Sequence, residues 1–301
     1  MIQLLIDTDV GGDVDDAFAI ALAALSNRIN LIAITTSTGN TINRVKIASK
    51  LVKTLNKNPE IVAGIGNFHT IKNQDHTTTN RQNNATELIL RLSHKYPNNL
   101  IIAGIAPLTN IAHALKKDST LPKRIKKLVV LGGFMNQPKI NGKQQQVPLG
   151  FEYNLCTDLK ALDLILKAKF NFFLLLGDYT FIKKAQWTKQ ELKRLYANNQ
   201  PIILKLIAMK KIWDKTLEKK IRSAHLPKQL VKHWLNDIIL IEYLINPDFF
   251  EIKKVKINFE IKNNKYPLLK KVQDGYPINI IKPVKYRNLK KDILDQLINK
   301  V

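Results

Sequence analysis

Cysteine is nearly absent from this chain of 301 residues, which contains one, Cys156. A single thiol excludes an internal disulfide and a zinc site built from several cysteines, and it fits a reducing compartment. No apolar run reaches the roughly 18 to 20 residues that a membrane-spanning helix needs, and Met1 leads directly into a strand pattern instead of a signal segment. These absences predict a soluble cytoplasmic protein with no membrane partner.

Acidic residues are also few, with 24 Asp and Glu against 48 Lys and Arg, so the formal net charge is +24. A charge of this size makes polyanions possible partners. The lysines occur in small groups along the chain, without the aromatic residues of a single-strand binding surface. A biased codon composition would give the same abundance of Lys, Asn and Ile. We therefore expect nonspecific attraction to nucleic acid at low salt, and no specific nucleic-acid binding.

Five of the few carboxylates lie within ten positions, in the run from Asp7 to Asp16. Carboxylates this close raise each other's pKa, and burial at the end of a strand adds a desolvation cost. A divalent cation reverses both effects, and calcium and magnesium prefer such oxygen ligands. Gly11 and Gly12 allow the backbone to bend tightly around a bound ion. The run therefore predicts a metal site, whereas an acidic helix cap would explain one or two of the Asp residues.

Apolar runs typical of buried strands alternate with helical patterns, which predicts an open, mostly parallel α/β sheet flanked by helices. The acidic run falls between the first strand and an uncharged helix at Ala17 to Leu25, at the sheet edge where ligands bind. A segment near residues 184–245 is expected to be helical, and Phe250 to Ile261 to be an edge or hairpin strand. The strands are predicted at Leu4–Ile6, Leu31–Thr35, Leu100–Ile105, Leu128–Leu131 and Phe172–Leu176. The helices are predicted at about Asn43–Leu55, Ala85–His94, Leu108–Leu115, Leu159–Lys167, Lys189–Tyr196 and Leu289–Val301.

Polar clusters follow or accompany these elements in a characteristic order. They are Thr35 to Asn40, Ile105 to Asn110, Leu131 to Gly133, Phe151 to Asn154 with Asp158, and Trp234 to Asp237. Each cluster alone is a common turn or helix cap. Together with the acidic run, their order and placement resemble the inosine/uridine-preferring nucleoside hydrolase family from the first strand to about Phe249. The run from Asp7 to Ala17 is similar to a longer form of that family's opening motif, with two additional residues before the paired aspartates.

The resemblance implies one domain over residues 1–301 and hydrolysis of ribonucleosides to free base and ribose, with a calcium-positioned water. It also implies a role in purine or pyrimidine salvage, a small-molecule ribonucleoside as substrate and a homo-oligomeric state. By resemblance, the calcium ligands are Asp9, Asp16, the carbonyl of Ile105 and Asp237, and Asp9 is also the base that deprotonates the water. The residues that bind the substrate are Asp15, Asn40, Glu152, Asn154 and Asn236. Asp7 supports the site, and Asp13 has no role that carries over.

Two positions depart from the family pattern. Where the family usually has a His-Asp pair in a late helix, this chain has Asn236-Asp237. Asparagine cannot donate a proton to the leaving base, and the loss of such a proton donor typically lowers the rate by about 10² to 10⁴. His225, His233, or Tyr and Trp side chains around Trp213 and Trp234 are the alternative donors. The family's His-Gly motif is also missing at Lys72 to Asn84, where His76 stands near its position.

Three other interpretations stay open at this stage. The altered positions allow a catalytically weakened member that binds nucleosides or ribose. Ile6 to Val10 also fits the aspartyl nucleophile motif of a magnesium phosphatase of the haloacid dehalogenase type. That fold also needs a Gly-Asp-x-x-x-Asp motif late in the chain. Gly177-Asp178 matches its start, but the second aspartate is missing, because the position four residues after Asp178 is Ile182. The basic surface leaves a polyanion-binding protein as the last alternative.

Overall fold

Nine strands form one sheet in the order β10-β9-β11-β8-β5-β4-β1-β2-β3. In this computed structural model the described residues are 1–66, 84–136, 139–140, 143–144, 152–223, 235–260 and 268–299. The strands from β11 to β3 pair in parallel, and β9 joins the sheet antiparallel to both β10 and β11. The strands are β1 (Ile2–Thr8), β2 (Ile29–Thr36), β3 (Glu60–Ala63), β4 (Leu100–Ile105), β5 (Ile125–Leu131), β8 (Phe172–Leu175), β9 (Phe250–Glu260), β10 (Leu268–Lys271) and β11 (Tyr276–Pro283). β6 (Lys139–Ile140) and β7 (Lys143–Gln144) form a separate hairpin.

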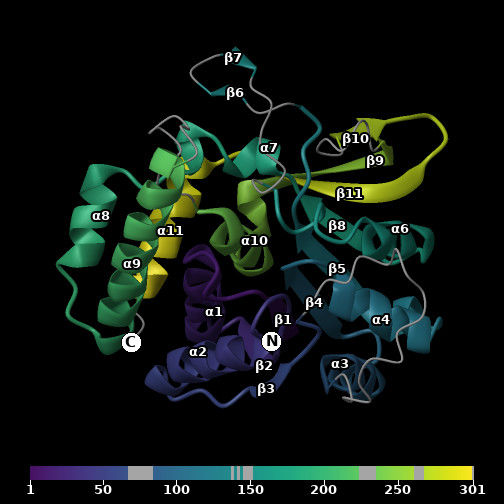
Figure 1. Cartoon of the computed structure of the whole chain (residues 1–301), viewed down its shortest axis with the longest axis horizontal. Coiled ribbons are helices and arrows are strands. Elements are labelled where there is room, and N and C mark those ends of the chain that lie inside the picture. Colours follow the sequence, from purple (N-terminus) through teal and green to yellow (C-terminus); the bar gives the residue numbers. More distant parts are fainter. Residues whose placement is uncertain are drawn as a thin grey trace.

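Helices cover both faces of the sheet, as the predicted α/β class requires (Figure 1). Successive side chains of β1 alternate between two apolar cores, with Leu4 and Ile6 in one and Leu5 in the other. The first core includes residues of α1, α2, α9, α10 and α11, and the second those of α3, α4 and α6. The longer helices are α1 (Asp15–Leu25), α2 (Thr41–Thr54), α3 (Asn84–Lys95), α4 (Thr109–Lys117), α6 (Leu159–Lys167), α8 (Lys189–Tyr196), α9 (Pro201–Ser223), α10 (Asn236–Ile245) and α11 (Tyr286–Asn299). The short ones are α5 (Leu121–Arg124) and α7 (Gly177–Thr180), with 3₁₀ turns at Lys183–Ala185 and Pro247–Phe249.

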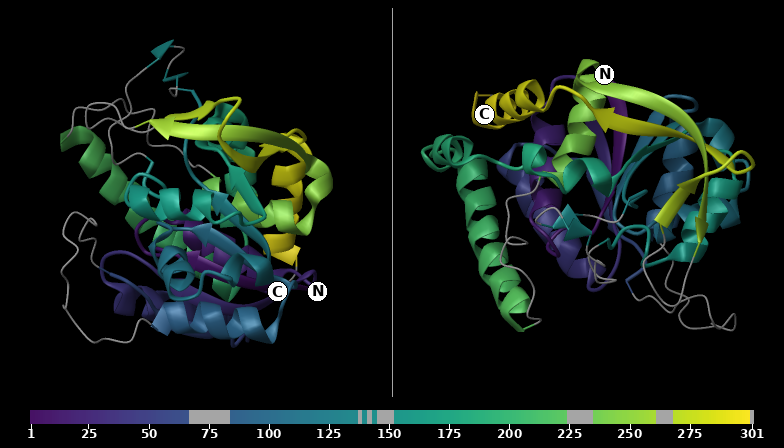
Figure 2. Two further views of the ribbon diagram at one scale, coloured as in Figure 1. Left: turned by 90° about the vertical axis from the view of Figure 1, so that its right-hand side faces the viewer. Right: turned by 90° about the horizontal axis from the view of Figure 1, so that it is seen from above.

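α1 is almost wholly enclosed by the fold, because residues 15–24 are all buried. Its sequence is apolar on every side, which suits a helix between the sheet and a second layer of helices. α10 and α2 pack against it, and α11 and α9 complete the layer. Figures 1 and 2 show α8, α9 and α11 grouped at one side of the molecule. The N-terminus of α1, and with it the acidic run, is therefore held by contacts along the whole helix.

Every strand and helix predicted from the sequence is found within a few residues, and the α/β class is confirmed. The segment near residues 184–245, which was expected to be helical, contains the helices α8, α9 and α10, and Leu235 directly before α10 is not helical. β3, β10 and β11 were not predicted from the sequence. Among the described residues, no helix is both long and apolar enough to cross a membrane.

Candidate active site

The acidic run forms the turn between β1 and α1, at the carboxyl end of a central strand. β1 pairs with β2 on one side and with β4 on the other, and the chain fills the β2 side before it returns to β4. Such a reversal of strand order leaves a crevice between the loops that follow the two strands. The acidic turn and the end of β4, at Ile105, therefore border the position where an α/β sheet binds ligands.

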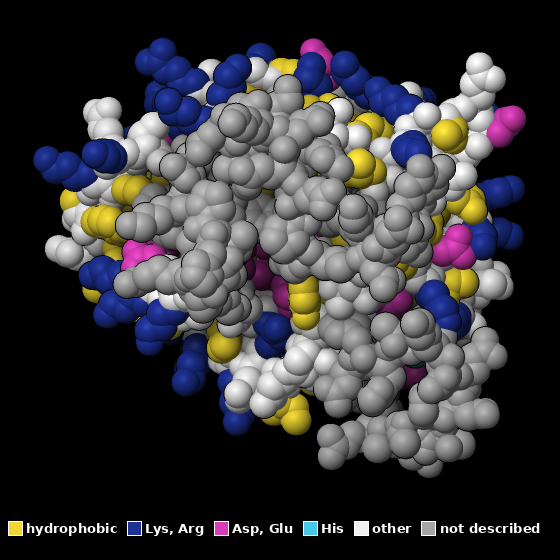
Figure 3. Space-filling view, turned by 45° about the horizontal axis from the view of Figure 1, so that its top comes forward, with side chains coloured by type: hydrophobic (Ala, Val, Ile, Leu, Met, Phe, Trp, Pro, Cys, Tyr) yellow, Lys and Arg dark blue, Asp and Glu magenta, His cyan; other side chains and the backbone are white. Residues whose placement is uncertain are grey.

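Three buried carboxylates meet at this edge, from Asp15 and Asp16 at the start of α1 and Asp237 at the start of α10. Each offers an oxygen within 4.8 Å of the others. In Figure 3 acidic side chains are visible deep in a recess near the middle of the face, while most Lys and Arg side chains lie toward the outer edge of that face. Because α1 and α10 pack against each other, residues far apart in the sequence form one acidic group.

The pKa shifts show how costly this group is without a cation. Burial raises the pKa of Asp16 and of Asp237 well above the usual value, and the charges of Asp9 and Asp15 raise both further. A bound divalent ion removes this penalty. The donors are all hard carboxylate oxygens, which calcium and magnesium prefer. The residues present therefore fit a divalent metal.

Hydrogen bonds within the turn fix the orientation of Asp16 and place Asp9 beside it. The Thr8 hydroxyl and the Asp9 backbone N–H, at 3.2 Å, both donate to Asp16 Oδ1. Thr8 also accepts a bond from the Val10 N–H at 3.1 Å. One oxygen of Asp16 is thus used by the turn itself.

Asp7 lies beneath the turn and is fully buried. Thr35 and Asn110 donate to its Oδ1 at 2.6 and 2.8 Å, whereas its Oδ2 has no hydrogen-bond partner among the described residues. Burial is the main cause that raises the pKa of Asp7 to about 7. Asn110 also donates to the Thr36 carbonyl and accepts from the Ile65 N–H, so it joins the turns after β2 and β3. The supporting position predicted for Asp7 agrees with this placement.

Glu152 and Asn154 lie together at the carboxyl end of β5. The two carboxylate oxygens of Glu152 accept from the N–H groups of Leu155 and Cys156, each at 3.0 Å, and Asn154 Nδ2 donates to the Leu131 carbonyl at 3.1 Å. Gly132 makes this approach possible, because a Cβ there would lie 2.8 Å from Glu152 Oε1. Glu152 and Asn154, the two predicted sugar ligands of this segment, thus lie two strands away from β1.

Asn236 and Asn40 differ in exposure. Asn236 is buried, and its side chain hydrogen-bonds Asp15 while its Oδ1 has no partner within the described part of the chain. Asn40 is exposed and caps α2, with its side chain accepting from the Asn43 N–H at 3.0 Å. Ile105 is the last residue of β4 and pairs with Thr8. His76, His225, His233 and Trp234 fall outside the described residues.

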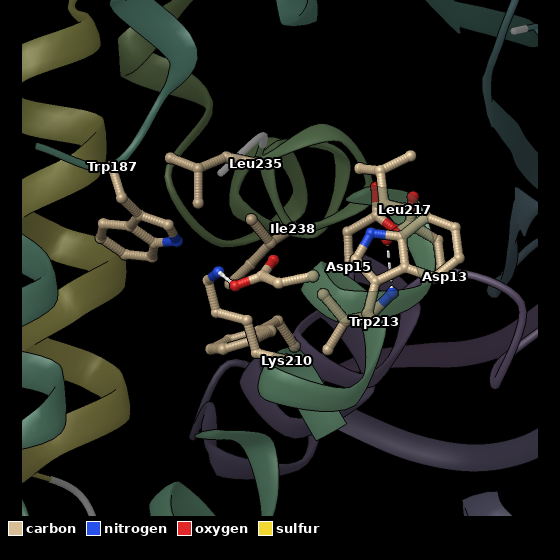
Figure 4. Close-up of a pocket in the computed structure, with 11 residues that line it drawn as sticks. Asp13, Asp15, Trp187, Lys210, Trp213, Leu217, Leu235 and Ile238 are labelled. Atoms are coloured by element: carbon tan, nitrogen blue, oxygen red, sulfur yellow. Dashed lines mark hydrogen bonds and ion pairs between the residues drawn. The ribbon is translucent and has the colours of Figure 1, made fainter. Parts of the chain in front are cut away.

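A small pocket of about 40 Å³ adjoins the acidic turn, between the starts of α1 and α10 and the helix α9. Asp13 and Asp15 line one wall, and Lys210 on α9 lines another (Figure 4). The Lys210 ammonium forms an ion pair with Asp214 at 2.5 Å. Trp213, which the sequence suggested as a proton donor, also lines this pocket. Lys210 could not be singled out from the sequence, since a lysine in a helix is usually solvated.

We expect the metal-free protein to lose stability as pH rises from about 5 to 7.5. The folded pKa of Asp7, about 7, lies above the ordinary value of 3.8, so the folded state holds this proton in a range where the unfolded chain has released it. A one-unit shift corresponds to about 1.4 kcal/mol, so the fall exceeds that amount. Urea unfolding at several pH values measures it, and Asp7→Asn should make the curve less steep, the remaining slope coming from Asp9, Asp16 and Asp237, whose pKa values are raised as well. A free energy of unfolding that rises with pH in the wild-type protein would contradict this assignment.

Known proteins share both the sequence pattern and the fold. The family model described as inosine-uridine preferring nucleoside hydrolase matches residues 4–275. Probable uridine nucleosidase 2 of Oryza sativa subsp. japonica is 30% identical over 154 residues, which cover 44% of this chain and 45% of that protein. The chain thus matches somewhat under half of that plant relative's length. The pyrimidine-specific ribonucleoside hydrolase RihA of Shewanella sp. (strain MR-7) is 25% identical over 284 residues, or 86% of this chain and 83% of that one.

A solved inosine-uridine preferring nucleoside hydrolase from Bacillus anthracis superimposes with a TM-score of 0.77 at 15% identity, covering 100% of both chains. A purine-preferring ribonucleoside hydrolase from Gardnerella vaginalis gives a TM-score of 0.75 at 19% identity, covering 99% of this chain and 98% of that one. At these identities the structures establish the fold, and the family model, which spans most of the chain, establishes the relationship. The chain belongs to the inosine-uridine preferring nucleoside hydrolase family.

Proposed function

We propose that this protein hydrolyses the N-glycosidic bond of ribonucleosides and releases free base and ribose. The observation that carries the proposal is the buried group of Asp15, Asp16 and Asp237 at the point where the strand order reverses. The fold and the family membership place this group in the context of nucleoside hydrolysis. Similar proteins carry names that specify uridine, pyrimidine or purine nucleosides, so the preferred base is left open.

We propose calcium as the ion, held by Asp9, Asp16, Asp237 and the Ile105 carbonyl. Bound there, calcium would lower the pKa of a coordinated water and orient it for attack. We assign to Asp9 the role of accepting the proton of that water, because its backbone N–H donates to the Asp16 carboxylate and so keeps the two residues side by side. The ring of neighbouring carboxylates stabilises the positive charge that develops on the sugar as the glycosidic bond breaks.

The ribose hydroxyls are assigned to Asp15, Asn40, Glu152 and Asn154. Glu152 and Asn154 are oriented by backbone contacts, and Asp15 is oriented by Asn236. Groups that are fixed before the substrate binds lose little freedom on binding, which favours the reactive orientation of the sugar. Because the assigned groups meet hydroxyls, deoxyribonucleosides should be poorer substrates.

A weakened member that binds nucleosides or ribose is the second candidate function, and Asn236 favours it. Asparagine has no acidic proton to transfer to a leaving base, and its side chain is already bonded to Asp15. Loss of a general acid typically lowers a rate by about 10² to 10⁴. Such an enzyme would turn over slowly on bases that need a proton, while its sugar site stayed intact.

The wider setting is also proposed. One sheet takes its strands from residues 2 to 283, which supports a single domain over residues 1–301. The single cysteine suits a reducing compartment, and we propose that the protein acts in the cytoplasm. We also propose a role in nucleoside salvage and a homo-oligomeric state, as the family resemblance implies. A small nucleoside is the partner that the recessed acidic site suits, and this site would repel the phosphates of a nucleic acid despite the positive net charge of the chain.

Release of free ribose from inosine, adenosine, guanosine, uridine and cytidine, with and without a calcium chelator, tests the proposal. We expect release that the chelator stops and that added calcium restores, with 2′-deoxyinosine as the matched poor substrate. Binding of ribose and calcium without release would favour the weakened member. If the protein neither bound nor cleaved any of these nucleosides, that result would contradict both candidate functions.

A further inference from the structure

Arg44, on the first turns of α2, connects two loops that carry proposed site residues. Its Nη1 donates to the Val10 carbonyl at 2.9 Å, its Nε to the Thr38 carbonyl at 2.7 Å and its Nη2 to the Thr38 hydroxyl at 3.3 Å. Val10 follows Asp9, and Thr38 precedes Asn40 by two residues. We propose that Arg44 is a positioning residue, which holds the acidic turn against the turn after β2 and so fixes Asp9 for the reaction proposed above.

The guanidinium occupies the space between the two turns. A Cβ built on Gly12 would lie 3.5 Å from its Nη1, and one built on Gly39 would lie 3.6 Å from its Nη2, so a side chain at either glycine would be in van der Waals contact with the group. Thr38 and Gly39 both have positive φ, at 62° and 60°. A loop with two such residues in succession gains from an external partner that fixes its carbonyls, because this conformation is unfavourable for threonine.

Arginine suits this position better than lysine would. The three acceptors lie around one planar group, and the guanidinium presents its donors in a rigid fork, whereas an ammonium on a flexible stem cannot keep the same three bonds. Charge-assisted bonds to carbonyls are also stronger than neutral ones. Arg44 meets the acidic turn at the Val10 carbonyl and next to Gly12.

Three variants separate the hydrogen-bond geometry of the guanidinium from its charge. Arg44→Met removes both, Arg44→Lys keeps only the charge, and Lys46→Met is the control that changes an exposed cation on the same helix. Two readouts apply to each, the kcat and KM for ribose release and the affinity for terbium, a luminescent calcium substitute. Terbium binding needs no turnover, so it tests Arg44 even if the proposed reaction fails in the wild-type protein. Thermal unfolding shows that each variant is folded.

We expect Arg44→Met to lower kcat by about 10-fold to 100-fold, because a small misplacement of a reacting group has effects of that size. KM should change less, since the residue does not touch the substrate. Terbium should bind at least 3-fold more weakly, Arg44→Lys should recover only part of both losses, and Lys46→Met should match the wild type. The proposal is overturned if Arg44→Met leaves kcat and terbium affinity unchanged, or if Arg44→Lys restores both fully, since charge alone would then suffice.

Discussion

Replacing Asp9 with asparagine will reduce ribose release by at least about 10³-fold, within the range expected when a general base is removed. Asparagine keeps the shape of the side chain and lacks the anionic oxygen that accepts a proton and binds a cation. The fold should be retained, because Asp9 raises the pKa of Asp16 and Asp237, and removing its charge relieves that repulsion in the metal-free protein.

Single-turnover and steady-state assays, together with thermal unfolding in chelator, measure both parts of this prediction. Asp248→Asn is the matched control, because Asp248 is an exposed aspartate near the end of α10. Turnover at the wild-type rate in Asp9→Asn would remove Asp9 from the mechanism. A large loss of stability instead of activity would make Asp9 a structural residue.

Replacing Lys210 with methionine will lower the free energy of unfolding by about 3 kcal/mol, because it leaves a buried ion pair without its cation. The Lys210 side chain is 4% exposed and that of Asp214 is 29% exposed, and their charged atoms are 2.5 Å apart. Asp13 lines the same pocket and loses the nearby positive charge as well. Methionine preserves most of the apolar stem, so the loss reports on charge.

Urea unfolding of four proteins tests this prediction: the wild type, Lys210→Met, Asp214→Leu and the double variant. The double variant should lose less free energy of unfolding than the two single variants lose together, because neither charge is left without a partner. Lys167→Met is the matched control, since Lys167 and Asp163 form a pair of the same helical spacing with exposures of 58% and 35%. Its effect should stay below about 1 kcal/mol. Equal losses in the two lysine variants would show that burial adds nothing to the Lys210 pair.

The fold was predictable wherever burial makes a local pattern. β4 and the Leu128–Leu131 part of β5 are continuous apolar runs because they are covered on both faces, and α6 and α8 match their predicted ranges because their apolar spacing is regular. β3 is a short strand at the sheet edge with half-buried residues, so its sequence carries little signal. β11 contains Pro277 and Pro283, which argue against a strand, and only its pairing with β8 and β9 makes it one.

The site was predictable in part for the same reason. The density of aspartates between β1 and α1 is a local signal, and it identified the turn before any fold was known. Asn110, Arg44 and Lys210 support that turn from other elements, and each is of a residue type that is common in helices and loops. Which distant residues meet the turn depends on how α2, α4 and α9 pack, and spacing along the chain does not contain this information.

The packing of α1 against α10 affects how the metal site forms as the chain folds. Asp16 and Asp237 are separated by more than 200 residues in the sequence, yet their carboxylates approach within 4.8 Å. An ion held between them closes a loop of that length, and closing a loop of 100 residues by a covalent cross-link removes about 4.7 kcal/mol of unfolded-state entropy. Bound metal would therefore join the first and last thirds of the chain as a reversible cross-link. A chain still emerging from the ribosome lacks the second half of the site, so tight metal binding becomes a property that only the finished molecule acquires.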